Sequence, residues 1–175
     1  DPVAQSDSLG ARRVSGGMLA EIYEVPKPDV AGTVVNCAGN CLAPGIVDLG
    51  VKVSEPGERH KESFRSAGRA AAAGGVTTIV TRPDTQPAID TPETLEFVAR
   101  RAALDAPVRV LPMAALTKGR EGREMTEIGF LQDAGAVAFT DCDRPCARPE
   151  PIGWGLCDIR QIRVPARLAR CVTDG

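Results

Sequence analysis

Histidine is nearly absent from this sequence, since the 175 residues contain a single one, His60. The six cysteines form no C-x-x-C pair, and the histidine lies far from them in sequence. Both features argue against a structural zinc site, which needs such ligands at close spacing. The favoured interpretation of the cysteines is therefore small thiols in a reducing compartment.

Long apolar runs and basic clusters are also missing. No window approaches the roughly 18 consecutive apolar residues of a membrane span, and the N-terminal residues lack the layout of a signal peptide. The net charge is −2, and lysine and arginine form no continuous run. The sequence therefore predicts a cytoplasmic protein with neither a nucleic-acid nor a membrane partner.

The composition that remains, 43% hydrophobic and 25% charged, predicts one globular core for a chain of this length. The first 38 residues contain the β-like runs "ARRVS", "MLAEIYEV" and "TVVNCA", separated by glycines and by the stretch "PKPDVAG". These short runs predict a small N-terminal sheet.

From residue 45 onward, strand-like runs alternate with helical patterns. The predicted strands are 45–53, 76–81, 107–116 and 136–140, and the predicted helices are 61–75, 91–105 and 122–135. The second helix has the clearest start, with Thr91 as N-cap, Pro92 at the first helical position and Glu93 in the first turn. The strands recur about every 30 residues, the size of one β-α repeat. Four parallel strands with helical crossovers are the predicted result.

Two α/β architectures fit this rhythm, an open doubly wound sheet or part of an eight-stranded β/α barrel. No G-x-G-x-x-G follows the first strand of the repeat, which disfavours a dinucleotide-binding fold. In both architectures, ligands gather beyond the C-terminal ends of the strands. Here those ends read "DLGVKVSEPG", "VTRPDTQP", "MAALTKG" and "FTDCDRP".

Several of these segments, taken in order, resemble the N-terminal part of bacterial dihydroorotases, members of the amidohydrolase superfamily. The segments are "APGIVDLGVKVSEPGERHKESF", "AAAAGGVTTIVTRPDTQPAIDTPE" and "VRVLPMAALTKGREGREMTEIGFLQDAGAVAFTDCDRP". The resemblance runs to about residue 145. It implies a metal-bearing TIM-like β/α barrel, of which this chain has about four β-α units, and a small β-sandwich built partly from N-terminal strands.

In that family the first barrel strand ends in D-x-H-x-H-x-R-E-P-G, where the histidines bind zinc and the arginine holds the carboxylate of the substrate. Here Gly50 and Lys52 occupy the histidine positions, and Ser54 occupies the arginine position. Glycine has no side chain to donate, and the lysine ammonium has no lone pair. The retained residues of this motif are Asp48, Glu55, Pro56 and Gly57.

Two further turns depart from the family pattern. The asparagine of M-P-N-T, which helps to bind substrate, is replaced by Asp84, whose carboxylate would repel an anionic substrate. The D-D-G turn supplies an acidic metal ligand, and here Asp141 is retained but Cys142 follows it. Each residue also has a plainer interpretation: Asp48 and Asp141 could hydrogen-bond strand-end or loop groups, and Gly50 and Lys52 could be ordinary loop residues. No metal and no catalytic residue is therefore expected.

The predicted organisation has three parts. Residues 1–44 contribute strands to a small β-sandwich, and residues 45–145 form the first half of a β/α barrel. Residues 146–175 form an atypical tail, rich in arginine, proline and cysteine, without helix or strand periodicity. A complete barrel needs about 250 residues. The chain is thus either a fragment or has a shifted reading frame after about residue 145.

Three functional hypotheses remain. The first is a non-catalytic dihydroorotase-like protein that, as the resemblance implies, assembles with the catalytic chain of aspartate carbamoyltransferase in pyrimidine synthesis. The second is an active cyclic amidohydrolase with an unusual zinc site, since hydrolysis of a cyclic amide near neutral pH needs a metal-activated water. The third is a product without a stable fold. Substitutions at the ends of three different strands favour the first.

Overall fold

The structure is a computed structural model, and it describes residues 10–15, 18–23, 32–38, 40 and 44–144. The chain divides into two compact units, Asp1–Pro44 and Gly45–Gly175, and each is considered by itself. The predicted atypical tail, 146–175, lies outside the described residues.

The first unit contains a two-stranded antiparallel sheet. Strand β1 (Ala11–Ser15) pairs with β2 (Met18–Tyr23), with a register shift between Arg13 and Val14. The predicted small sheet is thus present. The predicted strand over 33–38 is wrong, because in the described part of this unit these residues form no ladder and end in a turn where Asn40 N donates to Cys37 O at 2.8 Å.

The second unit is an α/β structure built on a parallel sheet. Its strands are β3 (Ile46–Val51), β4 (Val76–Thr81) and β5 (Arg109–Pro112), in the order β3-β4-β5. Strand β4 matches its predicted bounds, and β3 and β5 lie within theirs. The predicted class, α/β with parallel strands joined by helical crossovers, is confirmed for this unit.

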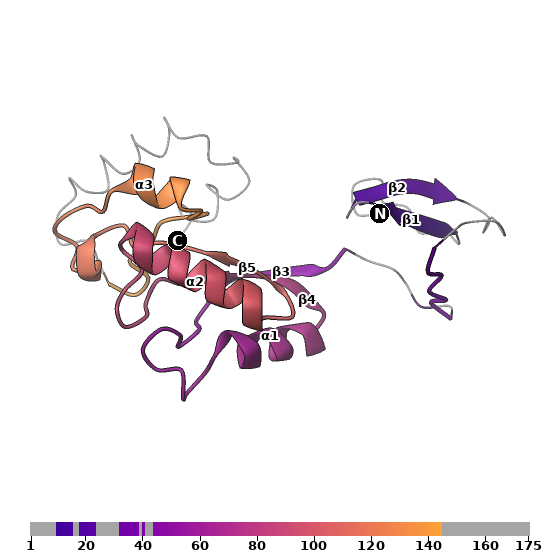
Figure 1. Ribbon diagram of the computed structural model, residues 1–175, viewed down its shortest axis with the longest axis horizontal. Helices are drawn as coiled ribbons and strands as arrows, with labels where there is room; N and C mark the ends of the chain where they lie inside the picture. The colour runs from indigo at the N-terminus through magenta and orange to yellow at the C-terminus, as the bar shows by residue number, and fades with distance from the viewer. Residues whose placement is uncertain (1–9, 16–17, 24–31, 39, 41–43, 145–175) are drawn as a thin grey trace. The chain divides into compact units, whose positions relative to one another are not determined.

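Two crossover helices lie along one face of this sheet (Figure 1). Helix α1 (Phe64–Ala73) begins at the N-cap Ser63, whose hydroxyl accepts from Ser66 N, and ends before Gly74. Helix α2 (Pro92–Asp105) begins at the N-cap Thr91, as predicted, and its hydroxyl accepts from Thr94 N. The apolar face predicted for α2 is fully buried: Leu95, Val98 and Ala102.

The fourth strand is rudimentary. Residues 136–140 were predicted to be a strand, but they form a single parallel bridge, Ala114↔Phe139. The hydrogen bonds of a parallel ladder nevertheless begin here, because Ala114 N donates to Ala138 O and Thr140 N donates to Ala114 O, both at 3.0 Å. The described chain therefore places a fourth segment beside the end of β5 without a full strand.

The helix predicted over 122–135 is shorter. Helix α3 covers Ile128–Asp133. The preceding residues pack against the segment after β5 instead, because the Thr126 hydroxyl donates to the carbonyls of Ala115 and Leu116 at 2.8 and 3.1 Å. The short 3-10 helix η1 (Lys118–Arg120) lies in the same connection. Tertiary hydrogen bonds thus outcompete the helical pattern at this N-terminus.

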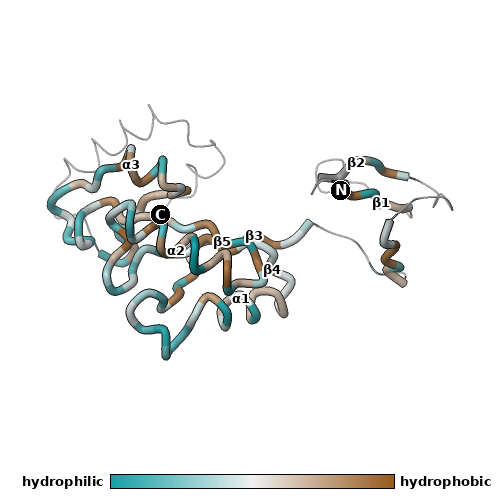
Figure 2. Tube along the Cα trace, viewed as in Figure 1, coloured by the Kyte–Doolittle hydropathy of each residue, from teal (hydrophilic) through white to brown (hydrophobic). Residues whose placement is uncertain are grey.

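The core of the second unit lies between the sheet and its helices. Its largest buried side chains include Phe64, Ile89, Leu95, Ile128 and Leu131. Figure 2 shows hydrophobic stretches along the strands of this sheet. No helix within the described residues is long and apolar enough to cross a membrane.

Candidate functional site

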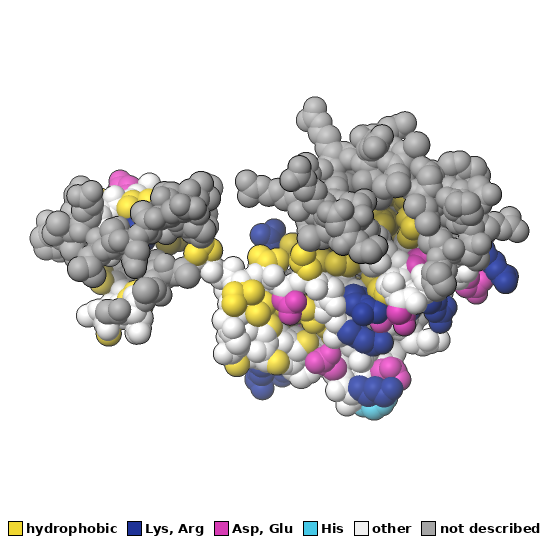
Figure 3. All heavy atoms as spheres, turned by 180° about the vertical axis from the view of Figure 1, so that it is seen from behind, with side chains coloured by type: hydrophobic (Ala, Val, Ile, Leu, Met, Phe, Trp, Pro, Cys, Tyr) yellow, Lys and Arg dark blue, Asp and Glu magenta, His cyan; other side chains and the backbone are white. Residues whose placement is uncertain are grey.

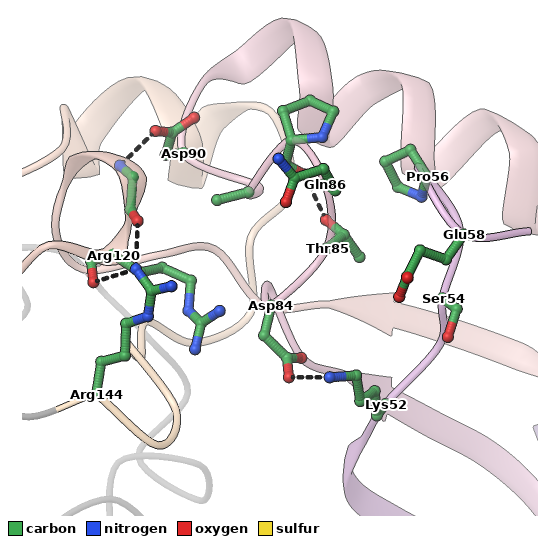
Figure 4. A pocket seen from close by; sticks show the side chains of 13 residues that line it. Lys52, Ser54, Pro56, Glu58, Asp84, Thr85, Gln86, Asp90, Arg120 and Arg144 are labelled. Atoms are coloured by element: carbon green, nitrogen blue, oxygen red, sulfur yellow. Dashed lines mark hydrogen bonds and ion pairs between the residues drawn. The ribbon is translucent and has the colours of Figure 1, made fainter.

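A pocket of about 660 Å³ opens at the C-terminal ends of the parallel strands (Figure 4). Loops that follow β3 and β4 line it, together with η1 and Arg144. The pocket contains Lys52 and Ser54 from the first loop and Asp84 from the second. The structure therefore brings together three of the substituted positions that the sequence identifies.

Lys52 and Asp84 form an ion pair across the ends of β3 and β4. Lys52 Nζ lies 3.0 Å from Asp84 Oδ2, and Arg82 Nη2 donates to the same oxygen at 3.0 Å. The Asp84 side chain is 4% exposed, whereas that of Lys52 is 58% exposed. One oxygen of this buried carboxylate is thus paired with two cations.

Asp141 is held by neutral hydrogen-bond donors. It is buried, and its Oδ1 accepts from the backbone N–H groups of Leu116 and Thr117, both at 3.0 Å. Its Oδ2 accepts from the Thr117 hydroxyl at 2.6 Å. These bonds fasten the segment after residue 139 to the connection that follows β5. Its carboxylate therefore accepts hydrogen bonds from the loop that follows β5.

Cys142 lies beside this carboxylate in the left-handed region, with φ of 60°. Its backbone N–H donates to the Thr140 hydroxyl at 3.0 Å. Burial raises the pKa of the Cys142 thiol, and the neighbouring Arg82 guanidinium offsets only part of that rise. A thiol whose pKa is raised is a poorer nucleophile near neutral pH, because less of it is present as thiolate.

The remaining substituted or candidate residues contribute little chemistry. Gly50 lies at the register shift near the end of β3 with φ of 82°, and an added Cβ would meet nothing within 4 Å. Asp48 is exposed on β3, and Ser54 is half-buried at the pocket. His60, the chain's only histidine, is exposed and does not line this pocket.

The retained residues Glu55, Pro56 and Gly57 contact helix α1 and the loop after β4. Glu55 is buried, and its Oε2 accepts from the backbone N–H of Phe64, the first residue of α1, at 3.1 Å. Pro56 O accepts from Gln86 N at 3.4 Å. Gly57 has φ of 101°, and an added Cβ would lie 2.3 Å from Gln86 O. These contacts join the loop after β3 to the loop after β4.

Sequence reasoning missed two arginines that organise the site. Arg120 is buried, and its guanidinium donates to Asp141 O at 3.2 and 3.0 Å and to Asp143 Oδ1 at 2.6 Å. Arg82 binds Asp84 and lies 3.8 Å from Asp143. The signal for Arg82 was its place directly after β4. Arg120 carries no such local signal, because its partners are more than 20 residues away in sequence.

The zinc that the resemblance implies does not fit these residues. Within the described ranges, no group of three or more His, Cys, Asp or Glu side chains could hold a metal ion. Of the two histidine positions, Gly50 offers no donor, and the ammonium of Lys52 is already paired with Asp84. A divalent cation would meet a positive charge here in place of two neutral imidazoles.

Comparison with known proteins places these features in a family. A family model described as "Dihydro-orotase-like" matches residues 39–145. The chain is 41% identical over 139 residues to a dihydroorotase-like protein of Pseudomonas putida, covering 79% of this chain and 33% of that protein. It is 43% identical over 129 residues to a dihydroorotase of Bacillus licheniformis, covering 74% of this chain and 30% of that protein.

A solved structure agrees with these similarities. An L-hydantoinase (dihydropyrimidinase) from Arthrobacter aurescens superposes with a TM-score of 0.65 at 26% identity, covering 74% of this chain and 28% of that chain. The chain thus spans about a third of the length of the curated relatives it matches.

Proposed function

This chain belongs to the dihydro-orotase-like family of the amidohydrolase superfamily. From that premise we propose that it is a protein of pyrimidine synthesis that does not itself hydrolyse dihydroorotate. Its role in this proposal is structural. It contributes part of a β/α barrel, with N-terminal strands of a small β-sandwich, that binds the catalytic chain of aspartate carbamoyltransferase.

The observation that carries the proposal is the Lys52–Asp84 ion pair. Hydrolysis of a cyclic amide in this superfamily needs a metal-bound water near the ends of the first strands. Here Lys52 Nζ lies 3.0 Å from the buried Asp84 carboxylate at that place. At the ends of β3 and β4 the pocket therefore holds an internal salt bridge in place of an open metal site.

The partner follows from family resemblance, and the scaffold is consistent with it. The residues that keep the sheet and loops in shape, Glu55, Gly57 and Asp141, make the buried contacts described above. A fold that has lost its chemistry can still present helices and loops to another protein.

The test uses the purified protein and the transferase chain of the same organism. We expect the purified protein to hold zinc no more tightly than about micromolar Kd, to lack dihydroorotate hydrolysis, and to co-elute with the transferase in size-exclusion chromatography. Stoichiometric zinc after dialysis, or turnover that zinc restores, would refute the non-hydrolytic half. Failure to change the size or thermal stability of the transferase would refute the partner half.

A companion experiment tests whether histidines at positions 50 and 52 suffice to restore hydrolysis. We expect the double variant Gly50→His with Lys52→His to remain inactive, because Ser54 and Asp84 still stand where the family has an arginine and an asparagine. The added histidine at residue 50 would also have to adopt a φ of 82°, which L side chains rarely do. Measurable turnover by this variant would show that the lost histidines alone explain inactivity.

The second candidate is an active cyclic amidohydrolase. The similarity to proteins named dihydroorotase, such as those of Bacillus licheniformis and of Sulfurihydrogenibium at 39% identity, favours it. Catalysis would then have to use a site other than the usual histidine pair. Metal analysis and the hydrolysis assay above decide between the two candidates.

A further inference from the structure

The buried carboxylate of Asp84 depends on cations from its own chain. Its side chain is 4% exposed, and its Oδ2 lies 3.0 Å from both Lys52 Nζ and Arg82 Nη2. Its Oδ1 has no hydrogen-bond partner within the described residues. Burial of an ionised carboxylate is costly unless it is paired, so these two cations must supply the compensation.

Asp141, the carboxylate that follows segment 136–140, shows the contrast. Two backbone N–H groups and a hydroxyl already satisfy Asp141, so its environment is built for a negative charge. Asp84 receives no such backbone donation among the described residues, where its partners are the two side-chain cations. Removing either cation therefore leaves a deficit that no nearby amide fills.

We propose that the Lys52 ammonium takes the place of a metal ion in this site. It supplies the positive charge that pairs with Asp84 and so links the end of β3 to the end of β4. Lys52 follows β3, and Asp84 follows β4 within the loop that Gly57 also contacts. Figure 4 shows the Lys52 side chain reaching across the pocket to Asp84. This inference rests on the proposed function in one respect, that the site holds no metal.

The chain offers a matched control for this lysine. Lys61 has the same side-chain exposure as Lys52, 58%, and it also pairs with a carboxylate, that of Glu58. The two pairs differ in the burial of the acid, because the Glu58 side chain is 47% exposed and that of Asp84 is 4% exposed. Lysine burial is therefore held constant while acid burial changes.

The experiment is a double-mutant cycle followed by urea unfolding. Every variant also carries Val47→Lys and Leu49→Lys on the exposed side of β3, so that association of the chain does not mask the folding equilibrium. Lys52→Met should reduce the folding equilibrium constant at least about tenfold, because one of two cations on a buried carboxylate is lost. Lys61→Met should reduce it about twofold or less, as for other exposed ion pairs. In the Lys52→Met background, Asp84→Asn should recover stability, since it removes the uncompensated charge.

Three outcomes would overturn the inference. The first is a Lys52→Met variant that is no less stable than Lys61→Met. The second is a double variant, Lys52→Met with Asp84→Asn, that is as unstable or as unfolded as Lys52→Met alone, a comparison that holds even if the single variant fails to fold. The third is a rise in Tm when zinc or manganese is added to the wild-type chain. Turnover by the purified protein would refute the proposed function without changing the cycle, so the two failures are distinguishable.

Discussion

Arg101 Nε donates to Glu55 Oε1 at 3.2 Å, joining helix α2 to the loop after β3 across 46 residues of sequence. Arg59 Nε lies 3.4 Å from the same oxygen, and the other oxygen of Glu55 accepts from the first N–H of α1. Asp105 extends this network by pairing with Arg101. The retained glutamate therefore connects two helices with a loop and needs no role in hydrolysis.

Glu55→Gln should destabilise the fold by about 2 kcal/mol, because it removes the charge from a buried acceptor of several charge-assisted hydrogen bonds. Urea unfolding measures the effect. Glu58→Gln is the control, since Glu58 makes an exposed pair with Lys61, and its loss should matter little. Equal stability of the two variants would contradict the structural role of Glu55.

Gly57→Ala should cost about 3 kcal/mol, from left-handed backbone strain and from the contact of its new Cβ with Gln86 O. Gly50→Ala should cost about 1 kcal/mol, because its φ is also positive but its Cβ meets nothing within 4 Å. Thermal unfolding of both variants gives the difference between the two losses of stability, which is the contribution of the steric contact with Gln86 O. Equal losses at the two sites would mean that the loops after β3 and β4 do not pack as described.

Cys142→Gly should be more stable than Cys142→Ala by about 1 kcal/mol, because residue 142 has φ of 60° and glycine relieves the strain. Both variants lose the thiol and its contact with Arg82, so the difference between their free energies of unfolding measures the backbone strain at residue 142 alone. Chemical denaturation of the pair measures it. An alanine variant as stable as the glycine variant would argue against a left-handed residue here.

The parts of the fold that local sequence determines were predictable. Helix α2 begins at Thr91 as predicted because the N-cap, Pro92 and the apolar spacing all lie within the helix itself. Strand β4 is likewise bounded by its β-branched residues. The substituted positions Lys52 and Asp84 were identifiable because they fall after consecutive strands.

The rest depends on distant partners. Segment 136–140 has the composition of a strand, but a ladder needs a neighbour along its whole length. Within the described residues, the backbone hydrogen bonds that this segment makes to β5 and the residues after it reach only Pro112, at the end of β5, and Ala114, just after it. Thr126 shortens the predicted third helix through bonds to carbonyls that precede it by ten residues or more. The pairing of Lys52 with Asp84 was equally hidden, because no local pattern reports which charges meet.

Strand β3 has an unpaired outer edge within the described residues and exposes apolar side chains. Strand β3 is the first strand of the sheet, and within the described residues nothing pairs with its outer side. Ile46, Val47 and Leu49 are 56%, 55% and 43% exposed. On the face in Figure 3, hydrophobic side chains gather on one side of the second unit and charged side chains on the other. Unpaired edges and apolar patches of this kind favour association.

We therefore expect the 175-residue chain, expressed alone, to form oligomers or aggregates, and charges on β3 to reduce them. Val47→Lys with Leu49→Lys should shift sedimentation toward the monomer, because lysine on an edge strand opposes pairing with another chain. Leu104→Lys is the control: this leucine is 72% exposed on α2, away from the strand edge. A sharp monomeric peak and a cooperative melt for the unmodified chain would contradict the expectation. An equal effect of Leu104→Lys would move the association surface from β3 to the helices.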